Sequence, residues 1–400
     1  MKRTRTTVGL AAAATLAVMS VGLVSANAGS ADDGPPGAPG ALYAATNEVT
    51  GNRIQIFSRG ADGQLVAGEA VPTGGLGSGG FEGSGNSVVL ADRGGESSPT
   101  NLTGGDRFLL ATNTGSGSVS VFRTTKDSLE LVETETTGDH PISVTVSQGI
   151  VYVLNGGTTN CLGGAPSITG FTMGADGTLT PIPDSTRPVS GGANSGCSQV
   201  SFNPKGDVLV VTEKMQDVIS TYLVGQDGLA TGPITNQTSG VGPFGFTFTQ
   251  TGKLLTSENF AGAAGQGAAA SYEIGRDGVL IPVSGTVRNN RSDTCWIVLS
   301  DNQRYAYVTN AMSNDISSYR VDPDGSMTLL QSIAGPADQA PAPFAIPADL
   351  TFSRDSKYLY ARNVRDGDIF GFSVGTDGTL TLIQTLANAL PPGAIGVAAS

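Results

Sequence analysis

The stretch Tyr305-Ala-Tyr-Val-Thr-Asn310 is a short run of strand-forming residues that ends in an amide side chain. Related runs occur six more times, at residues 42–47, 108–113, 150–155, 208–213, 253–258 and 358–363. Each run ends in Asn or Glu, and successive end positions lie 42 to 66 residues apart. A period of about fifty residues is typical of a four-stranded propeller blade. The repeat therefore predicts seven blades.

Each run is followed by an alternating segment and then by a tight turn. The predicted turns are Asp62-Gly63, Asp127-Ser128, Asp176-Gly177, Asp227-Gly228, Asp277-Gly278, Asp324-Gly325 and Asp377-Gly378. Asp-Gly between alternating strands indicates a hairpin, because glycine adopts the positive φ that such turns require. A further strand precedes each run, as at residues 200–206, so every unit holds four strands.

The two ends of the repeat predict how the ring closes. The first unit opens at Leu42 with what corresponds to a second strand, and residues 394–400 resemble a lone first strand. Pairing these segments completes the seventh blade and removes unpaired strand edges. We therefore predict an all-β fold, a seven-bladed β-propeller of four-stranded antiparallel blades, whose C-terminal strand joins the N-terminal blade.

The N-terminus has the pattern of a secretory signal peptide. Lys2, Arg3 and Arg5 precede an apolar run over residues 8–24, and a small-residue cleavage site follows, ending at Ala28. We expect residues 1–28 to be a signal peptide, 29–40 a flexible linker and 41–400 the propeller. The mature protein is then secreted and extracellular.

Charge narrows the class of partners. The formal net charge is −12, and loss of the basic signal segment would make it more negative. Such a surface repels phosphate backbones and anionic lipid heads, so we expect no nucleic-acid binding and no membrane binding after signal cleavage. The partners that remain are a small molecule or a surface ligand, and we expect a monomer.

Several segments resemble one family. The run at 305–310, Phe202-Asn-Pro-Lys-Gly206 and Gly375-Thr-Asp-Gly-Thr-Leu380 resemble the lactonase-type seven-bladed propellers, which include 6-phosphogluconolactonases and carboxymuconate cycloisomerases. The resemblance spans residues 41–400. It implies His, Arg and Glu side chains on the channel-facing surface, with an Arg-His pair opening one blade. This chain has Ser195-Gly196-Cys197-Ser198 there, while Glu213 keeps the carboxylate.

The ends of the second strands should share the face at the channel mouth. This predicted ring consists of Asn47, Asn113, Asn155, Glu213, Glu258, Asn310 and Asn363. The five asparagines could bind a polar ligand, or the ring could hold a hard cation such as calcium through oxygen ligands. The alternative is that each Asn caps its own turn. Glu213 and Glu258 are the candidate catalytic carboxylates, acting as general base or cation ligand. For Glu213, an ion pair with Lys214 or a solvated rim position is the alternative.

Connections between blades on the same face supply further candidates. Arg288 and Arg291 could clamp a substrate anion by bidentate hydrogen bonds, or could be exposed loop residues. His140, the single histidine, could act as an acid or base, or could be solvated. No residue spacing indicates a zinc site, and no cofactor other than a possible calcium ion is expected.

The three cysteines fit an exported protein. Cys161 and Cys197 fall near the same face of neighbouring units, so a disulfide between them is plausible. Cys295 is expected to be buried in an inner strand.

Two functions follow from these features. The first is a lactonase-like hydrolase, resembling 6-phosphogluconolactonase, that opens a small lactone at the channel mouth through Glu213 or Glu258. The second is a non-catalytic extracellular propeller that binds a protein, glycan or small ligand on rigidly held loops.

Overall fold

The computed structural model describes residues 39–91, 108–125, 128–336 and 346–400. They belong to a compact unit that spans residues 33–400. The predicted signal peptide, residues 29–38 of the predicted linker and Asp127 of one predicted turn lie outside the described residues.

The described strands form seven antiparallel sheets, numbered here as blades 1 to 7. Blade 1 contains β29 (Val397–Ala399), β1 (Gly40–Ala45), β2 (Arg53–Arg59) and β3 (Leu65–Pro72). Blade 2 contains β4 (Val88–Ala91), β5 (Phe108–Asn113), β6 (Ser118–Thr124) and β7 (Leu129–Thr136). Blade 3 contains β8 (Pro141–Ser147), β9 (Ile150–Asn155), β10 (Ser167–Met173), β11 (Leu179–Pro181) and β12 (Arg187–Pro188).

The remaining blades have four strands each. Blade 4 contains β13 (Cys197–Phe202), β14 (Val208–Glu213), β15 (Val218–Val224) and β16 (Ala230–Gln237). Blade 5 contains β17 (Pro243–Phe248), β18 (Leu254–Glu258), β19 (Ala268–Ile274) and β20 (Leu280–Arg288). Blade 6 contains β21 (Thr294–Leu299), β22 (Tyr305–Asn310), β23 (Asp315–Val321) and β24 (Met327–Pro336). Blade 7 contains β25 (Pro347–Phe352), β26 (Tyr358–Asn363), β27 (Ile369–Val374) and β28 (Leu380–Leu386).

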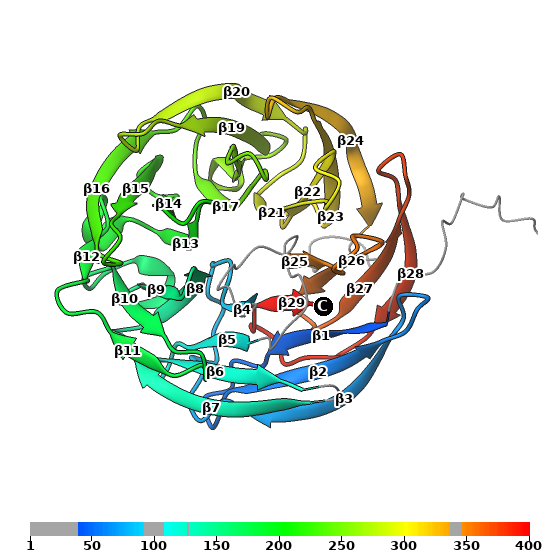
Figure 1. Cartoon of the computed structure of the whole chain (residues 1–400). Helices are drawn as coiled ribbons and strands as arrows, with labels where there is room; N and C mark the ends of the chain where they lie inside the picture. The colour runs from blue at the N-terminus through cyan, green and yellow to red at the C-terminus, as the bar shows by residue number, and fades with distance from the viewer. Residues whose placement is uncertain (1–38, 92–107, 126–127, 337–345) are drawn as a thin grey trace, which may run out of the picture. The chain divides into compact units, whose positions relative to one another are not determined.

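The blades are arranged in a ring, as Figure 1 shows. The first strand of each blade lies nearest the centre and the fourth lies at the periphery. The predicted seven-bladed, all-β fold is confirmed, and β5, β9, β14, β22 and β26 begin and end at the predicted residues. Three short 3-10 turns, Thr159–Cys161, Gly192–Asn194 and Phe260–Gly262, lie in connections on the channel-mouth face.

Blade 3 departs from the predicted four strands. Its outer strand is split into β11 and β12, and both pair with β10. Pro181, Pro183 and Pro188 lie in this outer segment. Proline has no backbone N–H to donate, so it interrupts a continuous ladder.

Tyrosines of the repeated run tie blades 3, 6 and 7 to the turn of the next blade. The Tyr307 hydroxyl donates to the Gly378 carbonyl at 2.8 Å, and the Tyr360 hydroxyl donates to the Gly63 carbonyl at 2.6 Å. The glycines of the six described Asp-Gly turns adopt φ between 78° and 93°. At Gly63 a Cβ atom would lie 2.3 Å from the Tyr358 ring, so both the backbone and the packing require glycine.

Apolar side chains pack between neighbouring blades. One buried cluster, for example, combines Leu110 and Val121 of blade 2 with Val144 and Val151 of blade 3. Because each sheet is covered on both faces, its central strands are buried throughout, as in β5 and β22. The stability of each blade therefore depends on both of its neighbours.

Strand β29 closes the ring by pairing with β1, as the sequence predicts. The Ser400 amide donates to the Ala41 carbonyl at 2.9 Å, and the Arg59 guanidinium donates to the Ser400 carbonyl at 2.8 Å. Leu42 and Phe57 of blade 1 also pack against blade 7 in one buried cluster.

Two charged residues of blade 7 support this closure from inside the ring. The Asp349 carboxylate accepts a hydrogen bond from the Val397 amide at 3.1 Å. Arg362, which is fully buried, donates to the Ala45 carbonyl at 3.1 Å and to the Pro391 carbonyl at 3.0 Å. Both side chains therefore connect blade 7 to segments of blade 1.

No helix in the described ranges is long and apolar enough to cross a membrane.

Burial makes the closure sensitive to pH. It raises the pKa of Asp349 to about 7, above the ordinary range of a carboxyl group. A carboxyl whose pKa is raised in the folded state stabilises the fold most at low pH, and this contribution is lost as the pH rises through the folded value. The free energy of unfolding of the wild type should therefore fall between pH 4 and pH 8. In Asp349→Asn we expect this fall to be smaller than in the wild type by about 2–4 kcal/mol.

Urea denaturation across this pH range measures the effect. Asp301→Asn, at an exposed position in the loop between β21 and β22, serves as the matched control and should keep the wild-type pH dependence. An unchanged pH dependence in Asp349→Asn would show that Asp349 does not hold a raised pKa in the fold.

Candidate functional site

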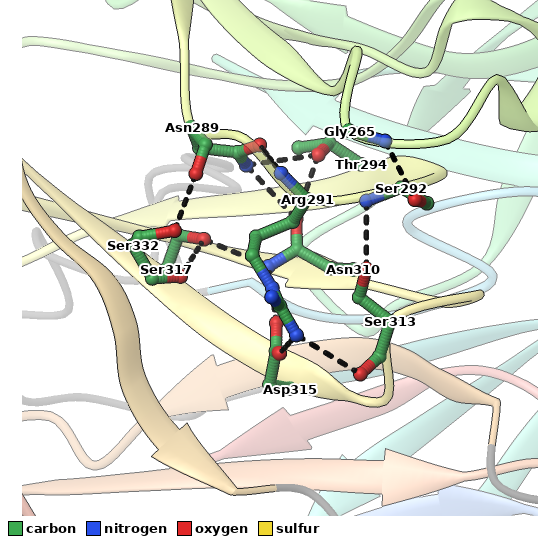
Figure 2. Close-up of polar contacts among 10 residues, drawn as sticks. All are labelled: Gly265, Asn289, Arg291, Ser292, Thr294, Asn310, Ser313, Asp315, Ser317 and Ser332. Carbon is green, nitrogen blue, oxygen red and sulfur yellow. Dashed lines mark hydrogen bonds and ion pairs between the residues drawn. The ribbon is translucent and has the colours of Figure 1, made fainter. Parts of the chain in front are cut away.

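Asn310 shows what the positions at the ends of second strands do. Its side chain is fully buried and donates to Asp315 and Ser317, both at 2.8 Å. Its amide oxygen accepts hydrogen bonds from Asn289 at 2.9 Å and from Thr294 at 2.6 Å. Figure 2 shows this network, in which Asn289 comes from the connection between blades 5 and 6. Asn310 therefore fastens the incoming connection to its own blade.

The other predicted asparagines have similar partners. Asn113 donates to Ser118 and Ser120, and Asn363 donates to Asp366. Asn155 donates to Thr169, and Asn47 donates to Ser78 and to the Gly80 carbonyl. All four side chains are buried. Asn113 and Asn363 thus make contacts across their own turns, as in the alternative given above, whereas Asn47 and Asn155 bind other segments.

Glu213 occupies the same position in blade 4 and is fully buried. Its carboxylate accepts hydrogen bonds from the amides of Ser190 at 3.1 Å and Gly191 at 2.6 Å, and from the Ser220 hydroxyl. Burial raises its pKa, and these donors oppose the shift. A solvated rim position is wrong because Glu213 is fully buried, and the ion pair with Lys214 is wrong because that ammonium donates to Gly196 and Ser198.

Glu258 is the counterpart in blade 5, with one difference. Strand register places Ala270 where Ser220 stands in blade 4, so Glu258 lacks the hydroxyl donor. Neither carboxylate oxygen accepts a hydrogen bond of normal geometry from a described residue. Burial raises its pKa, which the neighbouring Thr286 hydroxyl and Gly240 amide partly oppose. This carboxyl group is therefore poorly stabilised as an anion.

The two predicted arginines bind separate groups. The Arg288 guanidinium lies over the Phe260 ring, 3.8 Å from its centroid, and donates to the Gln266 carbonyl. Arg291 forms an ion pair with Asp315, which Figure 2 also shows. In the described structure the two side chains do not form a shared anion clamp.

His140 has a partner that the sequence analysis missed. Its Nε2 atom lies 2.9 Å from Oε1 of Glu82, and the Asn160 amide donates to Oε2 of Glu82 at 3.3 Å. Glu82 lies in the connection between β3 and β4, of which we call residues 78–87 the mouth strap. The Gly83 amide of the strap donates to the Asn160 side chain at 2.7 Å.

The mouth strap contacts several blades around the ring. The Trp296 indole donates to the Ser84 carbonyl at 2.9 Å, and the Gly85 amide donates to the Ser198 carbonyl at 3.0 Å. Trp296 belongs to blade 6 and Ser198 to blade 4. Together with the contacts from Asn47 and His140, these hydrogen bonds hold the strap in place across the central opening.

Lys214 lies beside the strap. Its ammonium donates to the Gly196 carbonyl and the Ser198 hydroxyl, both at 3.2 Å, and stands 5.1 Å from the centroid of the Phe244 ring. A Cβ atom on Gly83 would lie 3.6 Å from the Lys214 Nζ atom. Desolvation lowers the pKa of Lys214 to about 8, against the attraction of nearby acidic groups that include Asp293 and Glu82.

Asp293 and Cys295 complete this group of polar residues. The Cys295 thiol donates to the Asp293 carboxylate at 3.4 Å, and burial raises the pKa of both groups. Cys295 is free and buried in an inner strand, as predicted. We call Glu82, His140, Asn160, Lys214 and Asp293 the mouth cluster.

The central channel contains a cavity of about 80 Å³. Strap residues Gly85 and Asn86 line it together with the innermost strands, from which Gln199, Trp296 and Asp349 contribute side chains. Across the described ranges, no group of three or more His, Cys, Asp or Glu side chains is arranged to hold a metal ion.

Cys161 and Cys197 form a disulfide with a Cα–Cα distance of 5.3 Å, the pairing that the sequence analysis considered. It links the connection after β9 to the start of β13, close to the Lys214 contacts.

The two ring glutamates should respond differently to neutralisation. Glu213→Gln leaves one of three buried donors without its acceptor, so we expect the free energy of unfolding to fall by about 1–3 kcal/mol. Glu258→Gln removes a buried charge that lacks good donors, so stability should stay the same or rise. Urea denaturation at pH 7 tests the pair. If both variants were as stable as the wild type but had lost activity, the result would favour a catalytic role for Glu213 and Glu258.

Comparison with known proteins supports the fold and finds a partial match to one family. Residues 271–390 match the family model described as lactonase, 7-bladed beta-propeller. A 90-residue segment is 31% identical to a 6-phosphogluconolactonase of Enterobacter sp. (strain 638) and covers 22% of this chain. The match spans about a quarter, 27%, of that relative's length.

Solved structures resemble the whole propeller. A protein of Bacteroides fragilis, proposed to be a 6-phosphogluconolactonase, has a TM-score of 0.66 at 18% identity, covering 90% of this chain and 98% of its own. The periplasmic gluconolactonase of Pseudomonas aeruginosa has a TM-score of 0.62 at 16% identity, covering 90% and 99%. At these identities the likeness shows the fold. With the sevenfold repeat, the match of residues 271–390 to the family model confirms the predicted resemblance to lactonase-type seven-bladed β-propellers.

Proposed function

We propose that this protein is an exported hydrolase that opens a small lactone at the mouth cluster. The observation that carries the proposal is the pair formed by His140 and Glu82 at 2.9 Å, with the Lys214 ammonium beside the same strap. An imidazole oriented by a carboxylate is the arrangement of a general base. The family, whose curated relative is a 6-phosphogluconolactonase, supports a lactone as substrate.

In this mechanism the His140 imidazole accepts a proton from a water molecule that attacks the lactone carbonyl. Glu82 stabilises the resulting imidazolium. The Lys214 ammonium stabilises the negative charge that develops on the carbonyl oxygen. The bond between the carbonyl carbon and the ring oxygen then breaks, and the imidazolium returns its proton to the leaving oxygen. The product is an open-chain hydroxy acid.

Export is supported by independent features. Residues 1–28 have the basic, apolar and small-residue order of a signal peptide. The disulfide between Cys161 and Cys197 suits an oxidising compartment, because such bonds are kept reduced in the cytosol.

A second candidate function is binding without catalysis. Connections on the mouth face expose large apolar side chains, and exposed apolar groups mark interaction sites when they gather. These residues are Val49, Leu76, Phe81, Leu162, Met215, Val241 and Met312. A panel of lactones separates the candidates, because a binding module gives no turnover above the uncatalysed rate.

The base assignment makes a direct prediction. We expect His140→Gln to lower kcat by about two to four orders of magnitude, because the glutamine amide cannot accept the proton from water. Glu82→Gln should lower kcat to a smaller extent, since the imidazole remains. Arg288→Ala, on the same face but stacked on Phe260, is the matched control and should keep wild-type kcat. Unchanged turnover in folded His140→Gln would refute the mechanism.

The pKa of Lys214 predicts a pH dependence. Since its value is about 8, the ammonium is present below that pH and is lost above it. After subtraction of uncatalysed hydrolysis, kcat/KM should decline as the pH rises through 8. Lys214→Arg keeps its charge to higher pH and should shift the decline upward. If the decline stays at the same pH in this variant, another group is responsible.

A further inference from the structure

We infer that the lactone accepted by the mouth cluster is an uncharged, polyhydroxylated ring and not a phosphorylated one. This inference deepens the proposed function and rests on it. It comes from the balance of charges beside the proposed base and from the groups available to contact a ring.

The charges at the site disfavour a second anion. Lys214 is the cation of the mouth cluster, and the carboxylates of Glu82 and Asp293 both act on its charge. The ammonium is also held by the Gly196 carbonyl and the Ser198 hydroxyl. A phosphate dianion bound here would meet two carboxylates for one ammonium, and the carboxylates would repel it.

The arginines that could offset this repulsion are engaged elsewhere. Arg291 is paired with Asp315, and Arg288 is stacked on Phe260 with its guanidinium bound to the Gln266 carbonyl. Phosphate recognition generally uses a bidentate guanidinium or several amides directed at one point. The contacts of Arg288 and Arg291 direct neither of them to the strap.

The neutral groups around the cluster suit a polyol ring. The half-buried Asn160 side chain offers a donor and an acceptor that match sugar hydroxyls. Phe81 of the strap is 39% exposed, and its centroid lies 6.4 Å from that of the buried Trp296 ring. An exposed ring of this kind can pack against the apolar face of a sugar.

The experiment compares glucono-1,5-lactone with its 6-phosphate on the full chain. We expect kcat/KM to be at least ten-fold higher for the neutral lactone. Asp293→Asn removes one carboxylate and should reduce this preference several-fold by improving turnover of the phosphate. Asp301→Asn makes the same change in net charge on the opposite face and should leave the preference unchanged. Equal turnover of both lactones, or a preference for the phosphate, would overturn the inference.

Binding of non-hydrolysable rings separates this inference from the proposed function. Titration calorimetry with 1,5-anhydroglucitol and its 6-phosphate should show binding of the neutral ring, and at least ten-fold weaker binding of the phosphate. The same preference without turnover of any lactone would refute the hydrolase while leaving the ligand class intact. Tighter binding of the phosphate would refute the ligand class even in an active enzyme.

Discussion

The pairing of β29 with β1 is the contact on which the rest of the structure depends, because it joins segments separated by about the whole length of the propeller. Closing so long a loop costs chain entropy, although the cost grows slowly with length. The gain is a ring in which each sheet is covered on both faces. Tyr360 bonded to Gly63 and Arg362 bonded to Ala45 join blade 7 to the N-terminal strands of blade 1, and Asp349 bonded to Val397 holds β29 against blade 7. Ring closure is therefore stabilised by side-chain hydrogen bonds as well as by the backbone pairing of β29 with β1.

The fold was largely predictable because every blade has the same strand arrangement and needs similar contacts with its neighbours. Tyr307 and Asn310 show two contacts that the run provides in blade 6: the tyrosine binds the turn of the next blade, and the asparagine fastens the connection from the preceding one. Both contacts follow from blade geometry that repeats around the ring, so the sequence pattern records them. The split outer strand of blade 3 was missed, although its closely spaced prolines are the signal that could have revealed it.

The site was less predictable, for a physical reason. The ring positions stand out in the sequence because they repeat, but at most of them the repeated side chain makes buried contacts within the fold. Glu213 illustrates the point: it is buried under two backbone amides and a hydroxyl. Glu82 has no counterpart in the repeat, and its contact with His140 joins residues that are 58 positions apart. His140 stood out in the sequence as the single histidine. Its partner Glu82 could not be predicted, because their contact depends on the path that the mouth strap takes through the fold.

The mouth cluster exists only if the closed ring brings blades 3, 4 and 6 around the strap, and hydrogen–deuterium exchange tests this dependence most directly. A chain that ends at Gly396 lacks β29 and should be compared with the full chain. We predict that removal of β29 exposes the amides of β1 and of strap residues 83–85, while the central strands of blades 4 and 5 stay protected. If the strap amides remain as protected as in the full chain, the mouth cluster does not depend on ring closure, and the account is wrong.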